Sequence, residues 1–83
     1  MHKSIGEHLR EERKKQDLTV QMVASVCGTS RSYITLIEND RRLPGKKIIP
    51  KLAAALKLKT VVVLNWYLED IGRKIQKEIE NTP

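Results

Sequence analysis

The chain has 83 residues, 40% of them hydrophobic but only 4% aromatic, so it supports one modest core built from Leu, Ile, Val and Ala. Its net charge of +6 favours a polyanionic partner, either nucleic acid or an anionic membrane surface. A single cysteine, Cys27, excludes an internal disulfide, and the lack of both a signal segment and an apolar run of roughly 18 residues predicts a cytoplasmic protein.

Capping residues and turn signals predict an all-α fold of five helices. Ser4 and Glu7 form a capping-box pattern that begins a first helix, which ends near Gln16. Thr19 and Ser30 are placed to cap the next two helices. Apolar residues at helical spacing identify the sides that face the core: Ile5, Leu9, Val23, Ala24, Cys27, Ile34, Ile37, Leu52, Ala53 and Leu56.

The second and third predicted helices are joined by a tight turn. The second covers residues 20–26, and Gly28 then supplies the positive φ that a sharp turn needs. The third covers residues 31–39, and the small Ala24 lets the two helices approach closely. In a DNA-binding unit of this kind, the second helix of the pair lies in the major groove with its N-terminal residues at the base edges.

The fourth and fifth predicted helices complete the chain. The fourth covers residues 47–57 with Pro50 in its first turn, where the missing N–H costs little. Thr60 is predicted to cap the fifth, over residues 61–80, although Gly72 weakens it by roughly 1 kcal/mol relative to Ala and its last turns are expected to fray. A coiled-coil-like stripe of apolar residues runs along this helix for barely more than two heptads: Val61, Leu64, Leu68, Ile71 and Ile75.

Three runs of residues resemble a known family: LTVQMVA at 18–24, CGTSRSYI at 27–34 and IEN at 37–39. Together with LAAALKL at 52–58, they resemble the phage-repressor/Cro-like helix-turn-helix family over about residues 4–58. The resemblance implies a compact, five-helix, lambda-repressor-like domain that binds double-stranded operator DNA as a two-fold dimer. It implies base contacts from five residues of the third helix: Arg31, Ser32, Tyr33, Thr35 and Leu36. Of these, Tyr33 is placed to contact either a base or a phosphate.

Arg31 offers a fork that can bind O6 and N7 of one guanine, worth about 1–3 kcal/mol of discrimination. The family commonly has Gln at the start of the second helix, where this chain has Val20, and Gln21 points about 100° away around the helix. The contact with DNA at the start of this helix is therefore expected to depend more on its backbone amides. The resemblance also implies an ion pair between Arg13 and Glu38 that orients the third helix. The residues expected to bind phosphate are Gln21, Arg41, Arg42, Lys46 and Lys47.

The positive charge is confined to one part of the chain. Residues 1–58 hold 12 Lys and Arg against 6 Asp and Glu, whereas residues 59–83 hold four of each. We therefore expect a DNA-binding domain over 1–58 and a C-terminal helix over 59–83 that either completes the core or pairs with a second copy. A homodimer is favoured, because reading a palindrome requires a fixed half-site separation. Its expected interface is Val61, Leu64, Trp66, Leu68, Ile71 and Ile75.

Catalytic and metal chemistry find no support in the sequence. His2, His8 and Cys27 match no zinc pattern, and no phosphate-binding loop or nucleophile–base pair is present, so we expect neither enzyme activity nor a cofactor. The leading hypothesis is a transcriptional regulator, favoured as a repressor. Two alternatives stay open: an antitoxin or other partner-binding protein with autoregulatory DNA binding, and a controller of restriction–modification genes. A membrane-surface role is least favoured, because the basic residues surround a compact motif.

Overall fold

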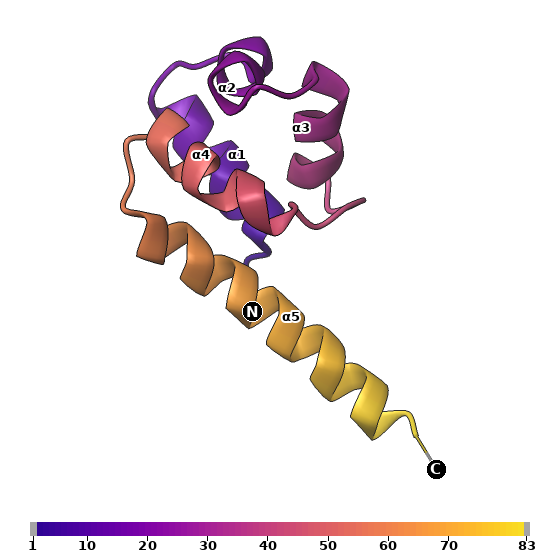
Figure 1. Cartoon of the computed structure of the whole chain (residues 1–83). Coiled ribbons are helices and arrows are strands. Elements are labelled where there is room, and N and C mark those ends of the chain that lie inside the picture. Colours follow the sequence, from indigo (N-terminus) through magenta and orange to yellow (C-terminus); the bar gives the residue numbers. More distant parts are fainter. Residues whose placement is uncertain (1, 83) are drawn as a thin grey trace.

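The computed structural model describes residues 2–82, and this part of the chain is all-helical. Figure 1 shows the shorter helices packed around one another and the long last helix, which lies against them and projects beyond them. None of the helices in this range is long and apolar enough to cross a membrane. The elements are α1 (Ile5–Lys15), α2 (Val20–Cys27), α3 (Arg31–Glu38), a 3-10 turn (Lys46–Ile48), α4 (Ile49–Ala55) and α5 (Thr60–Glu80).

The first three helices have the predicted side-chain caps. The hydroxyl oxygens of Ser4, Thr19 and Ser30 each accept, at 3.1 Å, the backbone N–H three residues later. The predicted cap at Thr60 is wrong, because Thr60 is itself the first helical residue of α5. The extended residue before it is Lys59, which makes no side-chain capping bond. The chain therefore enters α5 one residue earlier than the hydroxyl suggested.

Gly28 makes the predicted turn between α2 and α3. Its φ is 64°, and a Cβ there would meet no atom within 4 Å, so the backbone conformation and not the available space requires glycine. The N–H of Thr29 donates to the carbonyl of Ala24 at 3.0 Å, and that of Gly28 donates to Ser25 at 3.2 Å. These two bonds form a Schellman motif, which satisfies carbonyls at the end of α2.

Three other helices end with a non-glycine residue in the left-handed region. Asp17, Asp40 and Lys57 have φ between 55° and 59°. In each case the N–H of the following residue donates to the carbonyl five residues earlier, at 2.9–3.0 Å. The sequence predicted this geometry only at Gly28, because only glycine adopts a positive φ without a steric cost.

The core contains every residue that was predicted to face it. Each of the ten is at most 3% exposed, and Ile49 and Val63 join them. Burying a Val, Leu or Ile side chain stabilises the fold by about 1.5–3 kcal/mol. Helix α4 is shorter than predicted: it begins at Ile49, after a 3-10 turn, and ends at Ala55, with Pro50 in its first turn as expected.

Helix α5 completes the core with one face and leaves an apolar stripe exposed on another. Val63 is fully buried, and the Trp66 ring stacks on His8 with centroids 4.3 Å apart. One helical turn further on, Asp70 is also buried. Because residues 63, 66 and 70 share a helical face, this face docks α5 onto the domain. The predicted stripe lies elsewhere: Ile71 is half-buried, and 38–53% of the side chain is exposed at Val61, Leu64, Leu68 and Ile75.

Candidate nucleic-acid interface

Helix α3 presents a mainly polar face to solvent. Ile34 and Ile37 are buried on its inner side, where they pack in the core. The Ser30 cap starts the helix and leaves Arg31 in its first turn, where the side chain is exposed. The outer face carries four of the five residues predicted to read bases, all of them exposed: Arg31, Ser32, Thr35 and Leu36.

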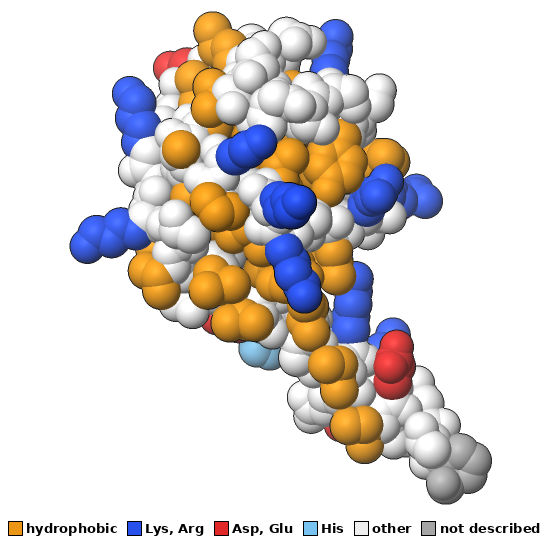
Figure 2. All heavy atoms as spheres, viewed as in Figure 1, with side chains coloured by type: hydrophobic (Ala, Val, Ile, Leu, Met, Phe, Trp, Pro, Cys, Tyr) orange, Lys and Arg blue, Asp and Glu red, His pale blue; other side chains and the backbone are white. Residues whose placement is uncertain are grey.

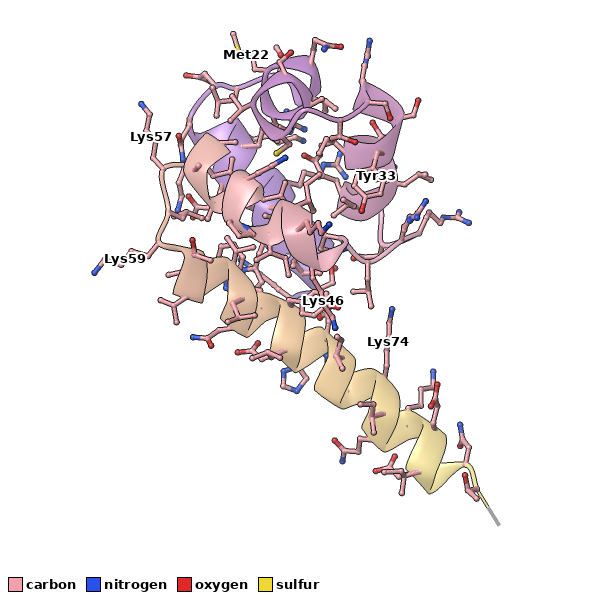
Figure 3. The ribbon with its side chains drawn as sticks, in the orientation of Figure 1. Met22, Tyr33, Lys46, Lys57, Lys59 and Lys74 are labelled. Carbon is pink, nitrogen blue, oxygen red and sulfur yellow. The ribbon has the colours of Figure 1, made fainter. Side chains whose placement is uncertain are left out.

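Tyr33, the fifth predicted base reader, is half-buried and braces the loop between α3 and α4. The Gly45 N–H donates to its hydroxyl oxygen at 2.8 Å, and the Arg42 guanidinium lies 5.1 Å from its ring centroid, within cation–π range. Figure 3 shows the ring in the space between α3 and α4. Because the hydroxyl accepts from Gly45, its own proton can be donated to another oxygen.

Positively charged side chains lie on the segment that connects α3 to α4. Figure 2 shows Lys and Arg side chains over α4 and at the α3–α4 loop. Lys46 and Lys47 line an open cleft of about 560 Å³ together with Lys51, which the sequence analysis missed. The available signal was the spacing of Lys47 and Lys51, since residues four apart share a helical face. The five residues predicted to bind phosphate are all exposed: Gln21, Arg41, Arg42, Lys46 and Lys47.

The start of α2 has free backbone donors. Val20 occupies the first helical position and packs against the core, whereas Gln21 is exposed and its amide donates to Ser25 Oγ at 3.3 Å. The Thr19 hydroxyl accepts the Met22 N–H. The N–H groups of Val20 and Gln21 precede the first bonds of the helix and point outward from its N-terminus. Such donors favour an anion regardless of the side chains beside them.

Arg13 and Glu38 connect α1 to the last turn of α3. Arg13 Nε donates to Glu38 Oε2 at 2.8 Å and Nη2 to Oε1 at 3.0 Å, while Nη1 donates to the Leu18 carbonyl at 2.9 Å. The side chains are only 12% and 7% exposed. A two-point pair with planar geometry restricts rotation as well as separation. The ion pair implied by the family resemblance is thus present, where it can orient α3.

An apolar groove runs between α4 and α5. It has a volume of about 380 Å³ and includes Pro50, Leu64, Tyr67 and Leu68 in its lining. Figure 2 shows hydrophobic side chains continuing from the domain along α5. The groove and the exposed stripe of α5 therefore form one apolar surface.

Cysteine and histidine take packing positions. Cys27 is 1% exposed, and burial raises the pKa of its thiol, so it is a small core residue and not a reactive nucleophile. His8 stacks on Trp66. Within residues 2–82, no group of three or more His, Cys, Asp or Glu side chains is placed to hold a metal ion.

The sequence matches a protein family and curated relatives. The Helix-turn-helix family matches residues 9–63. The chain is 45% identical over 56 residues to the HTH-type transcriptional repressor RghR of Bacillus subtilis (strain 168), and 34% identical over 56 residues to the ImmF control region 10 kDa protein of Bacillus phage phi105. These matches cover 66% and 68% of this chain but only 42% and 62% of the relatives, so it spans less than two thirds of either.

The fold is similar to those of two solved regulatory proteins. The restriction-modification controller protein C.AhdI from Aeromonas hydrophila matches with a TM-score of 0.67 and 32% identity, over 71% of this chain and 89% of that one. The biofilm regulator SinR, in complex with DNA, matches with a TM-score of 0.65 over 72% of this chain and 97% of that one. At 24% identity, the second likeness shows the fold alone.

Proposed function

This chain belongs to the phage-repressor/Cro-like helix-turn-helix family of DNA-binding transcriptional regulators, and we propose that it represses transcription by binding a pseudo-palindromic operator as a homodimer. In this proposal, helix α3 of each subunit enters the major groove. The observation that carries it is the exposed face of α3, which is oriented by a buried ion pair and flanked by cations.

The side chains divide into base readers and phosphate binders. Arg31 directs its fork at O6 and N7 of a guanine, and Leu36 meets a thymine methyl. Tyr33 donates its hydroxyl proton to a phosphate and not to a base, because Gly45 and Arg42 hold its ring at the loop. Exposed cations and the backbone donors at the start of α2 bind phosphates and so fix the register without reading sequence. The phosphate set is Gln21, Arg41, Arg42, Lys46 and Lys47.

Arg31→Ala is expected to weaken binding to the selected operator by about 1–3 kcal/mol and to flatten the preference at one base position per half-site. Lys47→Ala is expected to weaken binding to all sequences alike and to lower the salt slope by about one unit. Selection from a randomised DNA library, repeated with each variant and followed by titrations at several salt concentrations, measures both effects.

Lys57→Ala serves as the control for the lost charge. Figure 3 shows Lys57 pointing away from α3 at the opposite side of the domain, so this variant should retain both affinity and selectivity. Selectivity that survives Arg31→Ala unchanged would remove Arg31 from the base readers. A library that returns no enriched sequence with the unmodified protein would contradict operator binding itself.

The proposed dimer uses the exposed stripe of α5 and the adjoining groove. Residues 1–58 then form the DNA-binding domain, while residues 59–83 serve both the subunit core and the interface. Trp66 contributes mainly inside the subunit, through its stacking on His8. Ile71 is half-buried and lies at the edge of the stripe. The other residues proposed for the interface are exposed: Val61, Leu64, Leu68 and Ile75.

Leu68→Glu is expected to weaken dimerisation by at least about 100-fold, because it places an unpaired carboxylate in the apolar interface of both subunits. Removing α5 altogether is a poorer test, since it also removes the buried Val63. Sedimentation or light scattering over a concentration series measures the change. Asn65→Glu adds the same charge at a nearby exposed position of α5 and should leave the dimer intact. A Leu68→Glu protein that dimerises normally would place the interface elsewhere.

A second candidate function has specific support. The chain is 32% identical to C.AhdI and covers 89% of that controller protein. We therefore also propose that the same DNA-binding activity controls restriction–modification genes. Restriction and methyltransferase genes beside the gene for this chain would favour it, and their absence would favour a general repressor.

A further inference from the structure

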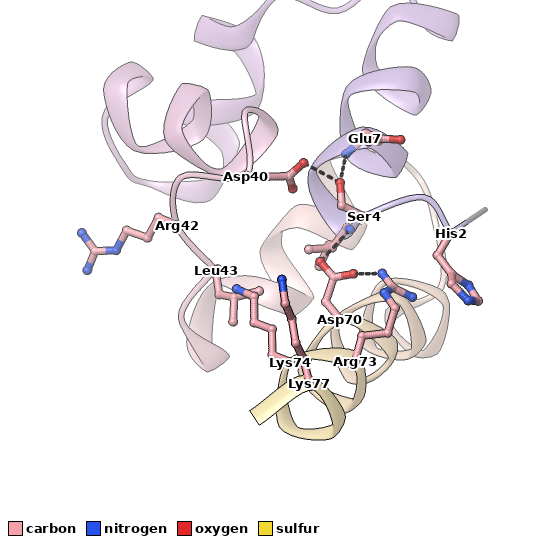
Figure 4. A pocket seen from close by; sticks show the side chains of 11 residues that line it. His2, Ser4, Glu7, Asp40, Arg42, Leu43, Asp70, Arg73, Lys74 and Lys77 are labelled. Carbon is pink, nitrogen blue, oxygen red and sulfur yellow. Dashed lines mark hydrogen bonds and ion pairs between the residues drawn. The ribbon is translucent and has the colours of Figure 1, made fainter. Parts of the chain in front are cut away.

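The N-terminus of α1 is held against α5 by a buried carboxylate. Asp70, which is 7% exposed, accepts the backbone N–H of Ile5 at 3.0 Å through Oδ2. Its other oxygen, Oδ1, accepts from the Arg73 guanidinium. Figure 4 shows this pair lining a cleft of about 340 Å³ between α5 and the loop that follows α3. One oxygen of Asp70 therefore ties α5 to the beginning of α1, and the other holds Arg73 of the same helix, whose guanidinium donates to the Lys3 carbonyl at 3.3 Å.

The same end of α1 is also tied to the end of α3. Ser4, the N-cap of α1, accepts the Glu7 N–H and donates its own hydroxyl proton to Asp40 Oδ2 at 2.7 Å. Asp40 terminates α3, and its N–H donates to the Ile37 carbonyl at 3.1 Å. These hydrogen bonds, together with the backbone between Ser4 and Ile5, therefore connect α5 to the last turn of the proposed recognition helix (Figure 4).

A polar group was not needed simply to hold α5 in place. Apolar contacts such as that of Val63 already dock the helix, and the hydrophobic effect that drives them is non-directional. A buried carboxylate stabilises a fold no better than a well-packed apolar side chain, whereas its hydrogen bonds restrict direction. The main effect of Asp70 is therefore to restrict how α5 is rotated relative to α1. It adds little to the stability of the contact between the two helices.

We propose that Asp70 is a positioning residue that sets the spacing between the two DNA half-sites. This inference rests on the α5-mediated dimer proposed above. In such a dimer the angle between α5 and α3 determines how far apart the two recognition helices lie. Half-sites one helical turn apart are separated by about 34–36 Å, and one base pair changes both that distance and the direction in which the groove faces. If the angle between α5 and α3 is fixed, the dimer fits only one spacing of the two half-sites.

The test compares operators that share the same half-sites but differ by one inserted or deleted central base pair. Asp70→Ala is expected to lower the preference for the best spacing over its neighbours by about tenfold, which corresponds to about 1.4 kcal/mol and is close to one hydrogen bond to a charged group. Affinity for an isolated half-site and the dimer dissociation constant should stay unchanged. Asp70→Asn retains an acceptor for the Ile5 N–H and should recover most of the preference.

Two further variants control for a general loss of stability. Glu69→Ala removes an exposed carboxylate from the neighbouring position of α5 and should keep the wild-type preference. Asp40→Gly breaks the bond to Ser4 at a residue whose φ of 59° suits glycine, so it should fold well and lose the spacing preference as Asp70→Ala does. A wild-type protein with no preference for paired half-sites would contradict the proposed dimeric function. A preference that survives both Asp70→Ala and Asp40→Gly would overturn the positioning role alone.

Discussion

Arg13→Ala is expected to lower the free energy of unfolding by about 3–5 kcal/mol, the usual cost of leaving one member of a buried ion pair without its partner. Glu38 is 7% exposed, so its carboxylate cannot recover full hydration when the guanidinium is removed. The variant also loses the bond from Arg13 to the Leu18 carbonyl. Urea denaturation followed by circular dichroism measures the change, because a domain of this size is expected to unfold in one cooperative step.

Arg10→Ala is the matched control, since Arg10 lies on the same helix and is exposed. Its effect should stay within about 0.5 kcal/mol. The double replacement of Arg13 by Met and Glu38 by Leu should recover much of the stability lost in Arg13→Ala, because no charge is then left unpaired. Equal stabilities for Arg13→Ala and Arg10→Ala would show that the pair contributes nothing to the fold.

Gly6→Ala is expected to incur an overpacking cost of about 3 kcal/mol, at the upper end of the usual range, and a net destabilisation of about 2 kcal/mol. A Cβ at this position would clash with the Ile37 carbonyl oxygen and lie 2.9 Å from that of Glu38. Both atoms belong to the backbone, so relief requires α1 and α3 to separate. The better helix propensity of alanine, worth about 1 kcal/mol, offsets only part of this cost. Thermal melting measures the shift in midpoint.

Gly72→Ala provides the contrasting case within the same chain. Gly72 lies inside α5, and a Cβ there would meet no atom within 4 Å. Helix propensity then acts alone and should stabilise the protein by up to about 1 kcal/mol. If Gly6→Ala were equally stabilising, the close approach of α1 to the end of α3 would be refuted.

Most of the helical framework could be predicted because its determinants lie within a few residues of one another. The caps at Ser4, Thr19 and Ser30 each act on an N–H three residues away, and Gly28 sets the turn by its own backbone freedom. Periodicity also identified the inward side of each of the first four helices. The same reasoning misplaced the start of α5, because a hydroxyl cannot show by itself whether it precedes the helix or belongs to its first turn.

Part of the candidate site could also be predicted from the sequence. The exposed face of α3 follows from the alternation of apolar and polar residues, and Arg31 lies in its first turn as the family resemblance implied. The role of Tyr33 could not be predicted in this way. It depends on a hydrogen bond from Gly45, which forms only when the loop folds back. Lys51 was missed because the cleft that it shares with Lys46 also includes residues 27–29 at the end of α2, and it exists only once the helices have packed.

The sequence by itself determined the helices, their caps, the tight turn and the inward faces, since these depend on neighbours within about two helical turns. Only the tertiary structure decided which face of α5 docks and why Gly6, Asp40 and Asp70 occupy their positions. Ser4 meets Asp40 across 36 residues, and Ile5 meets Asp70 across 65. A carboxylate leaves no periodic signal of a partner so distant in the chain, so its burial and direction emerge only when the helices pack.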